Sequence, residues 1–133
     1  GNIGCMCNGA GMGLATIDTI HLVGGQPANF LDLAGANNPE VATNAMRIVV
    51  SDPQVKVVLI NLFGGITRLD RLATTLVEYI QNNPFNKPMV IRLAGNYSEE
   101  GWKTLDESGI SFIKAHTLQE AAEKAVAAAA NAN

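Results

Sequence analysis

The chain has 133 residues, 47% of them hydrophobic and 16% charged, and its formal net charge is -3 at pH 7. That composition suits one domain with a substantial core and argues against disorder. The acidic balance gives no basic surface for nucleic acid, and no apolar run reaches the length of a membrane span, so neither is an expected partner.

Strand and helix patterns alternate from the amino terminus onward. Residues 3–7 predict a short strand, which Asn8-Gly9-Ala10-Gly11 ends. The helix that follows is expected to turn inward Met12, Ala15, Thr19, Ile20 and Val23. Residues 29–33 predict a second strand. Asn38 and Pro39 supply the N-cap and first-turn proline of the next helix, with an expected inner face of Val41, Ala45, Ile48 and Val49.

The longest apolar run, at residues 55–63, predicts a strand buried on both faces of a parallel sheet. Two glycines end it, and we expect the N–H groups of Gly65, Ile66 and Thr67 to open the following helix. That helix has the clearest amphipathic spacing in the chain, in Leu69, Leu72, Ala73, Leu76 and Ile80.

The second half repeats the alternation. Residues 88–93 predict a fourth strand, and a helix beginning near Ser98 and capped by Gly109 should turn Trp102 and Leu105 inward. Residues 110–113 predict a fifth strand, and residues 117–120 fit a capping box before an alanine-rich helix. Residues 1–133 are therefore expected to form one three-layer, flavodoxin-like α/β domain. Its five-stranded parallel sheet should have the order 2-1-3-4-5, with helices on both faces.

This strand order places a candidate binding site at the carboxyl ends of the first and third strands. The turn at Asn8 and the loop at Gly65, Ile66 and Thr67 should face each other across one crevice. An amide side chain and free backbone N–H groups suit a carboxylate or a phosphate. The alternative is that the glycines serve only tight turns and close packing.

Other polar residues allow two interpretations each. Asp32 is either catalytic or the cap of a loop, and Arg92 either binds an anion or pairs with a carboxylate. Arg68 and Asp70 either pair with each other or contact a partner. His21 and His116 have no nucleophile or carboxylate close in sequence, which favours surface or capping roles.

The remaining motifs give weaker signals. Cys5 and Cys7 are too close along a strand for a disulfide and too few for a zinc site, which favours buried, reduced thiols. The glycines at positions 9, 11 and 13 have the wrong spacing for a dinucleotide loop. No metal site and no catalytic residue of this chain's own is predicted.

Several segments, in order and with even spacing, resemble the carboxy-terminal domain of the succinyl-CoA synthetase β subunit. The resemblance covers essentially the whole chain and is carried by residues 1–6, 8–11, 27–32, 61–68, 92–93 and 95. It implies a reversible ligase that converts succinate, CoA and ATP or GTP into succinyl-CoA, nucleoside diphosphate and phosphate. In this family an α subunit carries the phosphohistidine and the CoA site. The nucleotide and Mg²⁺ bind an ATP-grasp domain earlier in the β chain.

For this chain, the resemblance implies a fragment of the enzyme that binds no cofactor of its own and is inactive alone. Asn8, Gly65, Ile66 and Thr67 match the family's substrate contacts. The implied location is the cytoplasm in a prokaryote or the mitochondrial matrix in a eukaryote. Ala34-Gly35-Ala36 replaces the family's triple glycine, which leaves malate or another short acid as an alternative substrate. A non-catalytic docking module is the third hypothesis.

Overall fold

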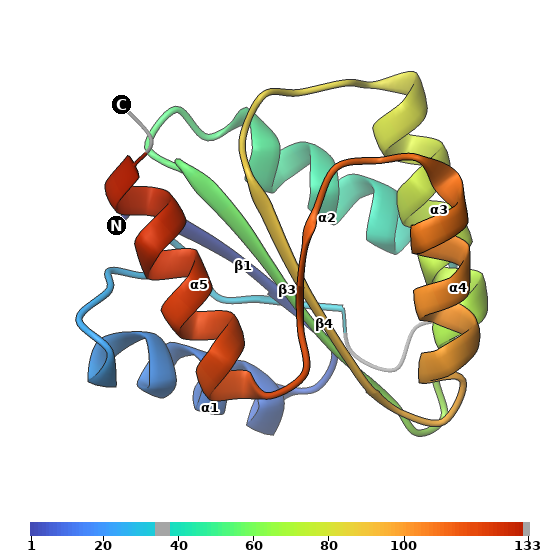
Figure 1. The fold of residues 1–133 in the computed structure, drawn as a ribbon, viewed down its shortest axis with the longest axis horizontal. Helices are drawn as coiled ribbons and strands as arrows, with labels where there is room; N and C mark the ends of the chain where they lie inside the picture. Colours follow the sequence, from blue (N-terminus) through green and yellow to red (C-terminus); the bar gives the residue numbers. More distant parts are fainter. Residues whose placement is uncertain (34–37, 132–133) are drawn as a thin grey trace.

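The computed structural model describes residues 1–33 and 38–131. Five parallel strands form one sheet in the order β2-β1-β3-β4-β5, which confirms the expected order (Figure 1). The strands are β1 Ile3–Cys7, β2 Leu31–Asp32, β3 Val57–Gly64, β4 Met89–Gly95 and β5 Ile113–Ala115. The Ala34-Gly35-Ala36 segment, which the sequence analysis linked to an alternative acid substrate, lies outside the described residues.

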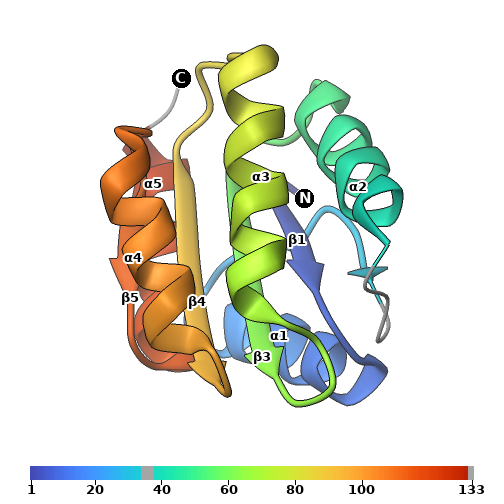
Figure 2. The same cartoon turned by 90° about the vertical axis from the view of Figure 1, so that its right-hand side faces the viewer.

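Helices cover both faces of this sheet, so the three-layer α/β architecture is also confirmed. Helices α1 (Ala10–Leu22) and α5 (Leu118–Asn131) pack side by side on one face. Helices α2 (Pro39–Ser51), α3 (Leu69–Asn82) and α4 (Ser98–Ser108) cover the other (Figure 2). Within the described part of the chain, no helix combines the length and the apolarity that crossing a membrane requires.

The central strand β3 contributes to two separate cores, because alternate side chains of a strand point to opposite faces. Val58, Ile60 and Leu62 join the core under α2, α3 and α4. Val57 and Leu59 join the smaller core under α1 and α5. Small side chains let α5 lie close to the sheet; its buried residues are Ala121, Ala122, Ala125 and Ala129. Burial on both faces of β3, as predicted, is confirmed.

Strand β2 is shorter than the predicted 29–33, because Asn29 replaces backbone pairing with side-chain pairing. The Cys5 N–H donates to Asn29 Oδ1 at 3.1 Å, and Asn29 Nδ2 donates to the Cys5 carbonyl oxygen at 2.8 Å. The amide of Asn29 therefore occupies the place of a peptide unit beside β1, and ladder pairing begins only at Leu31.

Replacing Asn29 by alanine should lower the free energy of unfolding by about 2 kcal/mol, because two buried backbone groups of Cys5 lose their partners. Urea denaturation of the chain measures this loss. Asn86→Ala is the control, since Asn86 is exposed in the loop before β4 and should change stability by less than about 0.5 kcal/mol. Equal midpoints for the two variants would contradict the role given to Asn29.

Two predicted helix faces are partly wrong. Helix α1 buries Gly13, Thr16 and Ile20, whereas Ala15 is exposed. This helix is apolar on nearly all sides, so its periodicity does not define one inner face. Helix α2 buries Ala42, Ala45, Met46 and Val49, whereas Ile48 is 61% exposed and Val41 37%. Its apolar stripe is displaced by one position from the predicted one.

The helix ends follow the predicted capping chemistry. Asn38 Oδ1 accepts the Glu40 N–H at 2.9 Å, and Pro39 occupies the first turn of α2. Thr117 Oγ1 accepts the Glu120 N–H at 3.0 Å, as in a capping box. Gly109 ends α4 in the left-handed conformation at φ 79°.

The predicted position of the fifth strand is wrong by about three residues. Ile110 and Phe112 instead pack against the core under α2, α3 and α4, and pairing with β4 starts only at Ile113. The shortened strand β2 and the shifted strand β5 are the two outermost strands of the sheet. An outer strand is short and pairs on one side only. Apolar residues beside it can therefore pack against the core without pairing with the neighbouring strand, and the apolar pattern does not fix where the strand begins.

Candidate functional site

A crevice of about 370 Å³ opens at the carboxyl ends of β1 and β3. Its lining residues are Asn8, Gly9, Ala10, Asp32, Phe63, Gly65, Ile66 and Thr67. The structure thus brings together all four residues predicted from the sequence to form one site. The crevice also contains Asp32, which the sequence left with two interpretations.

Asn8 joins the two walls of the crevice through both ends of its amide. Nδ2 donates to the Phe63 carbonyl oxygen at 2.7 Å, and Oδ1 accepts the Phe63 N–H at 2.8 Å. These two hydrogen bonds extend the pairing of β1 with β3 beyond the last residue of β1. An amide carries two N–H donors and two acceptor lone pairs, so Asn8 keeps one donor and one acceptor site for a ligand.

The loop of Gly65, Ile66 and Thr67 forms the opposite wall. The expectation that these residues open the helix is wrong, since α3 begins at Leu69 and Arg68 is its N-cap in an extended conformation. Ile66 is 85% exposed. Within the described part of the chain, the three N–H groups donate no backbone hydrogen bond. Gly65 and Ile66 are exposed, so their N–H groups can reach an anion as loop donors, a short distance ahead of the positive end of α3, whereas Thr67 is only 4% exposed and lies deeper in the wall.

The two neighbouring glycines of this loop have different roles. A Cβ on Gly64 would lie 1.9 Å from the carbonyl oxygen of Asn96, so the close approach of β3 to the end of β4 requires glycine there. A Cβ on Gly65 would meet nothing nearer than a Phe63 ring carbon at 3.9 Å. Close packing therefore explains Gly64 and does not explain Gly65.

Asp32 shapes the crevice from the other side. Its Oδ1 accepts the N–H of Gly9 at 2.6 Å, and Gly9 has a φ of 110°, which favours glycine. The loop-capping interpretation of Asp32 is supported by this contact. Its negative charge also disfavours an anion at this wall, which leaves the loop of Gly65, Ile66 and Thr67 as the favourable side.

Arg68 and Asp70 form a two-pronged ion pair at the start of α3. Arg68 Nε lies 3.1 Å from Asp70 Oδ1, and Nη2 lies 2.9 Å from Oδ2. The hydrogen bond to Arg68 lowers the pKa of the Asp70 carboxyl, and the guanidinium lies 3.8 Å from the ring centroid of Tyr97. The pairing alternative is thus confirmed, and the pair fixes the segment that follows the crevice.

The histidines lie away from the crevice. His21 is exposed in the last turn of α1, and His116 is exposed beyond β5, 6.0 Å from the Trp102 ring between centroids. A surface position for both is confirmed. Among the described residues, no group of three His, Cys, Asp or Glu side chains could hold a metal ion.

Asn61, in the middle of β3, was missed by the sequence analysis. It is fully buried, and its Nδ2 donates to Thr16 Oγ1 at 3.0 Å and contacts Met12 Sδ at 3.1 Å. Its Oδ1 accepts from Arg92 Nη1 at 3.1 Å. The detectable signal was a single amide inside an otherwise apolar run, because a polar side chain is buried only when its groups find partners.

The two thiols should weaken the fold at alkaline pH. Burial raises the pKa of Cys5 to about 12, helped by Cys7, and that of Cys7 to about 11, helped by Asp32. An unfolded chain releases these protons near its ordinary value of 9.0. Their stabilising contribution is therefore complete below pH 9 and is lost as pH rises through 9 to 12, at up to about 1.4 kcal/mol per pH unit for each thiol.

Urea midpoints between pH 8 and pH 11 measure this decline. The double variant Cys5→Ala, Cys7→Ala is the control, because it lacks both thiols and keeps every other side chain. We expect the urea midpoint of the double variant to fall less steeply with pH than that of the parent chain. Parallel declines would show that the thiols carry no such linkage.

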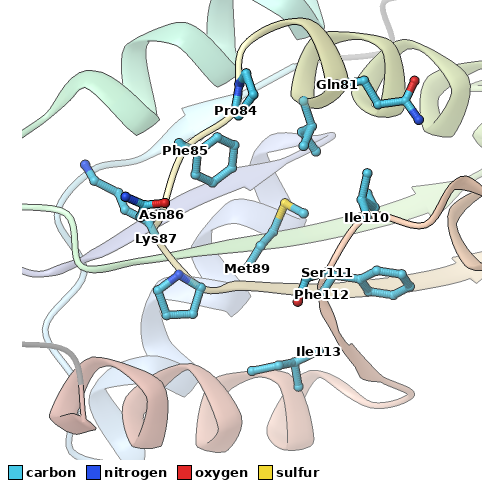
Figure 3. A pocket seen from close by; sticks show the side chains of 12 residues that line it. Gln81, Pro84, Phe85, Asn86, Lys87, Met89, Ile110, Ser111, Phe112 and Ile113 are labelled. Atoms are coloured by element: carbon cyan, nitrogen blue, oxygen red, sulfur yellow. The ribbon is translucent and has the colours of Figure 1, made fainter.

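A larger pocket, of about 490 Å³, lies at the amino end of β4 (Figure 3). The crevice, in contrast, lies at the carboxyl ends of β1 and β3. Its one titratable side chain, Lys87, donates to the carbonyl oxygens of Val50 at 2.8 Å and Asp52 at 2.7 Å. The ammonium group thereby holds the carboxyl end of α2. This contact gives Lys87 a structural role, and the pocket offers no arrangement for chemistry.

Comparison with known proteins bears on the family of the chain. A family model described as CoA-ligase matches residues 6–126. The chain belongs to the CoA-ligase family. This CoA-ligase domain is 53% identical over 126 residues to the Aquifex aeolicus protein named succinate–CoA ligase [ADP-forming] subunit beta, and 51% identical over 129 residues to that of Koribacter versatilis. These alignments cover 95% and 97% of the chain and 33% of each relative, so the chain spans about a third of their length.

Solved structures support the fold. A Pyrococcus horikoshii protein has a TM-score of 0.75 at 17% identity, covering 96% of this chain and 35% of its own. An ATP citrate lyase from Methanothrix soehngenii, solved with citrate and coenzyme A, has a TM-score of 0.75 at 19% identity, covering 96% and 36%. At these identities the likeness shows the shared architecture.

Proposed function

We propose that this CoA-ligase domain forms the carboxy-terminal part of a succinate–CoA ligase β subunit. The whole enzyme joins succinate to CoA at the expense of a nucleoside triphosphate, through an acyl phosphate. The observation that carries the proposal is the crevice, where residues matching the family's substrate contacts line one opening. Relatives about half identical over nearly the whole chain carry the same enzyme name.

The chemistry assigned to this domain is positioning and charge stabilisation. A succinate carboxylate, or the phosphoryl group transferred to it, is held by the N–H groups of Gly65, Ile66 and Thr67. Fixed donors of this kind need no reorganisation as negative charge builds up. Asn8 holds that loop in place through Phe63 and offers its second N–H to the acid.

The other functions belong elsewhere in the assembly. An α subunit brings the phosphohistidine and the CoA site to the crevice, and the remainder of the β subunit binds the nucleotide and Mg²⁺. The described residues contain no ligand set that fits such a metal. Assignment to the cytoplasm, or to the mitochondrial matrix in a eukaryote, follows from the same proposal.

A chimeric enzyme tests the proposal. This chain replaces the matching third of the Aquifex aeolicus β subunit, which is 53% identical to it, and the chimera is purified with the Aquifex α subunit. Succinyl-CoA formation is then measured once with ATP and once with GTP. We expect turnover with succinate, and none from the isolated 133-residue chain. An assembled chimera that prefers malate or another short acid would overturn the substrate assignment.

A docking role is the second candidate, because the crevice has an exposed apolar rim. Two residues that line it are exposed, Phe63 at 46% and Ile66 at 85%. Such a rim suits a protein surface. If docking were the domain's whole contribution, variants that close the crevice would keep activity as long as the subunits stay associated.

A further inference from the structure

Arg92 lies in a polar cluster on the α1 and α5 face of the sheet. Cys7, Asn61, Arg92 and Ala115 are register partners across β1, β3, β4 and β5, so the cluster crosses the middle of the sheet near its carboxyl edge. Arg92 is not among the residues that line the crevice. Arg92 therefore has no part in the acid site as proposed above.

Hydrogen bonds fix the direction of the Asn61 amide in this cluster. Thr16 Oγ1 donates to the Met12 carbonyl oxygen at 2.7 Å and accepts from Asn61 Nδ2 at 3.0 Å. Asn61 must then turn Oδ1 to the other side, where it accepts from Arg92 Nη1 at 3.1 Å. The cluster thus offers the guanidinium one neutral acceptor and no negative charge.

The charge of Arg92 has no counterpart in the described part of the chain. Arg68, Lys114 and Lys124 each form an ion pair, with Asp70, Asp106 and Glu120 respectively, whereas Arg92 forms none there. Its Nε is buried without a hydrogen-bond partner. Its Nη2 makes no hydrogen bond to the described residues and is not buried, so it reaches solvent.

A partly buried guanidinium without a carboxylate is costly, because burial removes water from a charge that nothing else neutralises. Arginine keeps its proton under almost any condition, so it does not escape this cost by becoming neutral. A bound oxyanion offsets the cost by supplying the opposite charge and charge-assisted hydrogen bonds at the solvent end of the side chain. The acidic side chains of α1 and α5 do not do so instead: Glu120 pairs with Lys124, and Asp18 and Glu123 are exposed and form no ion pair with Arg92.

We propose that Arg92 is the binding point for a small oxyanion, a carboxylate or a phosphate, on the α1 and α5 face of the sheet. The anion contacts the Nη2 end, while Asn61 and Thr16 hold the guanidinium in place from behind. This inference is independent of the proposed ligase function, because it concerns a different face and is tested on the chain alone.

The test follows the arginine Nε–H signals of the ¹⁵N-labelled chain by NMR at constant ionic strength. Inorganic phosphate and succinate are titrated separately, with chloride as the reference. We expect the Arg92 signal to shift saturably with at least one of the two oxyanions, and the tighter one identifies a phosphate or a carboxylate source. The absence of a saturable shift with both, or the same shift with chloride, would overturn the proposal.

Two variants make the assignment specific. Arg92→Lys keeps the charge and loses the planar fork, so affinity should fall about tenfold. Asn61→Asp supplies a permanent carboxylate to Arg92, and Thr16 can donate its hydroxyl to it, so oxyanion binding should disappear in a folded protein. Arg47→Lys is the matched control, since Arg47 is exposed on α2 and bonds only Asn44 among the described residues. Unchanged affinity in both cluster variants would contradict the site.

Discussion

Gly64→Ala should lower the free energy of unfolding by about 3 kcal/mol or more, a large effect for one methyl group. The new Cβ would lie 1.9 Å from the Asn96 carbonyl oxygen and 2.9 Å from its carbonyl carbon. These are backbone atoms, and the Asn96 N–H donates to the Gly64 carbonyl oxygen at 2.7 Å. No rotamer change relieves the overlap, so the ends of β3 and β4 must separate. Urea denaturation measures the loss.

Gly65→Ala is the matched control one residue further along. Its Cβ would have 3.9 Å to the nearest atom, so stability should stay within about 0.5 kcal/mol of the parent chain. The pair separates the packing role of one glycine from the binding role proposed for the next. Comparable destabilisation by both substitutions would show that the loop is packed more tightly than the structure has it.

Gly65→Val should have the largest effect on activity. In the chimeric enzyme, we expect kcat/KM for succinate to fall by about a hundredfold or more, because the branched side chain enters the crevice and displaces the donors from the acid. Steady-state kinetics with varied succinate measure the fall. Gel filtration of the same preparation shows whether the α subunit remains bound.

Thr74→Val is the control for this substitution. Thr74 is exposed on α3, away from the crevice, and its hydroxyl bonds only the Asp70 carbonyl oxygen among the described residues. It should leave kcat/KM unchanged. Full activity in Gly65→Val would remove the loop from the site. Loss of activity together with loss of the α subunit would favour the docking role.

The sequence predicts the central architecture because its strongest signals are buried and periodic. Strand β3 is apolar on both faces and β4 nearly so, which fixes them at the middle of a parallel sheet. The five strand–helix units then restrict the topology to very few arrangements. Once β1 and β3 are neighbours, Asn8 and Gly65 must lie together at the carboxyl ends of these strands, so the position of the crevice follows from the strand order alone.

The sequence does not predict the structure where a side chain takes the place of a backbone interaction. It also does not predict which face of a helix is buried where the helix has no distinct apolar face. Asn29 pairs with β1 through its amide, which shortens β2 without changing the apolar pattern. Three residues separate Gly65 from the first turn of α3, because Arg68 stays extended while it pairs with Asp70. The partners of Asn61 come from α1 and β4, far away in sequence, so only the fold reveals them.

The crystal structure of the assembled chimera with succinate tests the central claim most directly. The account predicts a succinate carboxylate in the crevice, within hydrogen-bonding distance of the N–H groups of Gly65, Ile66 and Thr67 and facing the α subunit. Succinate bound at another place in the assembly, with the crevice filled by side chains of the α subunit, would contradict it.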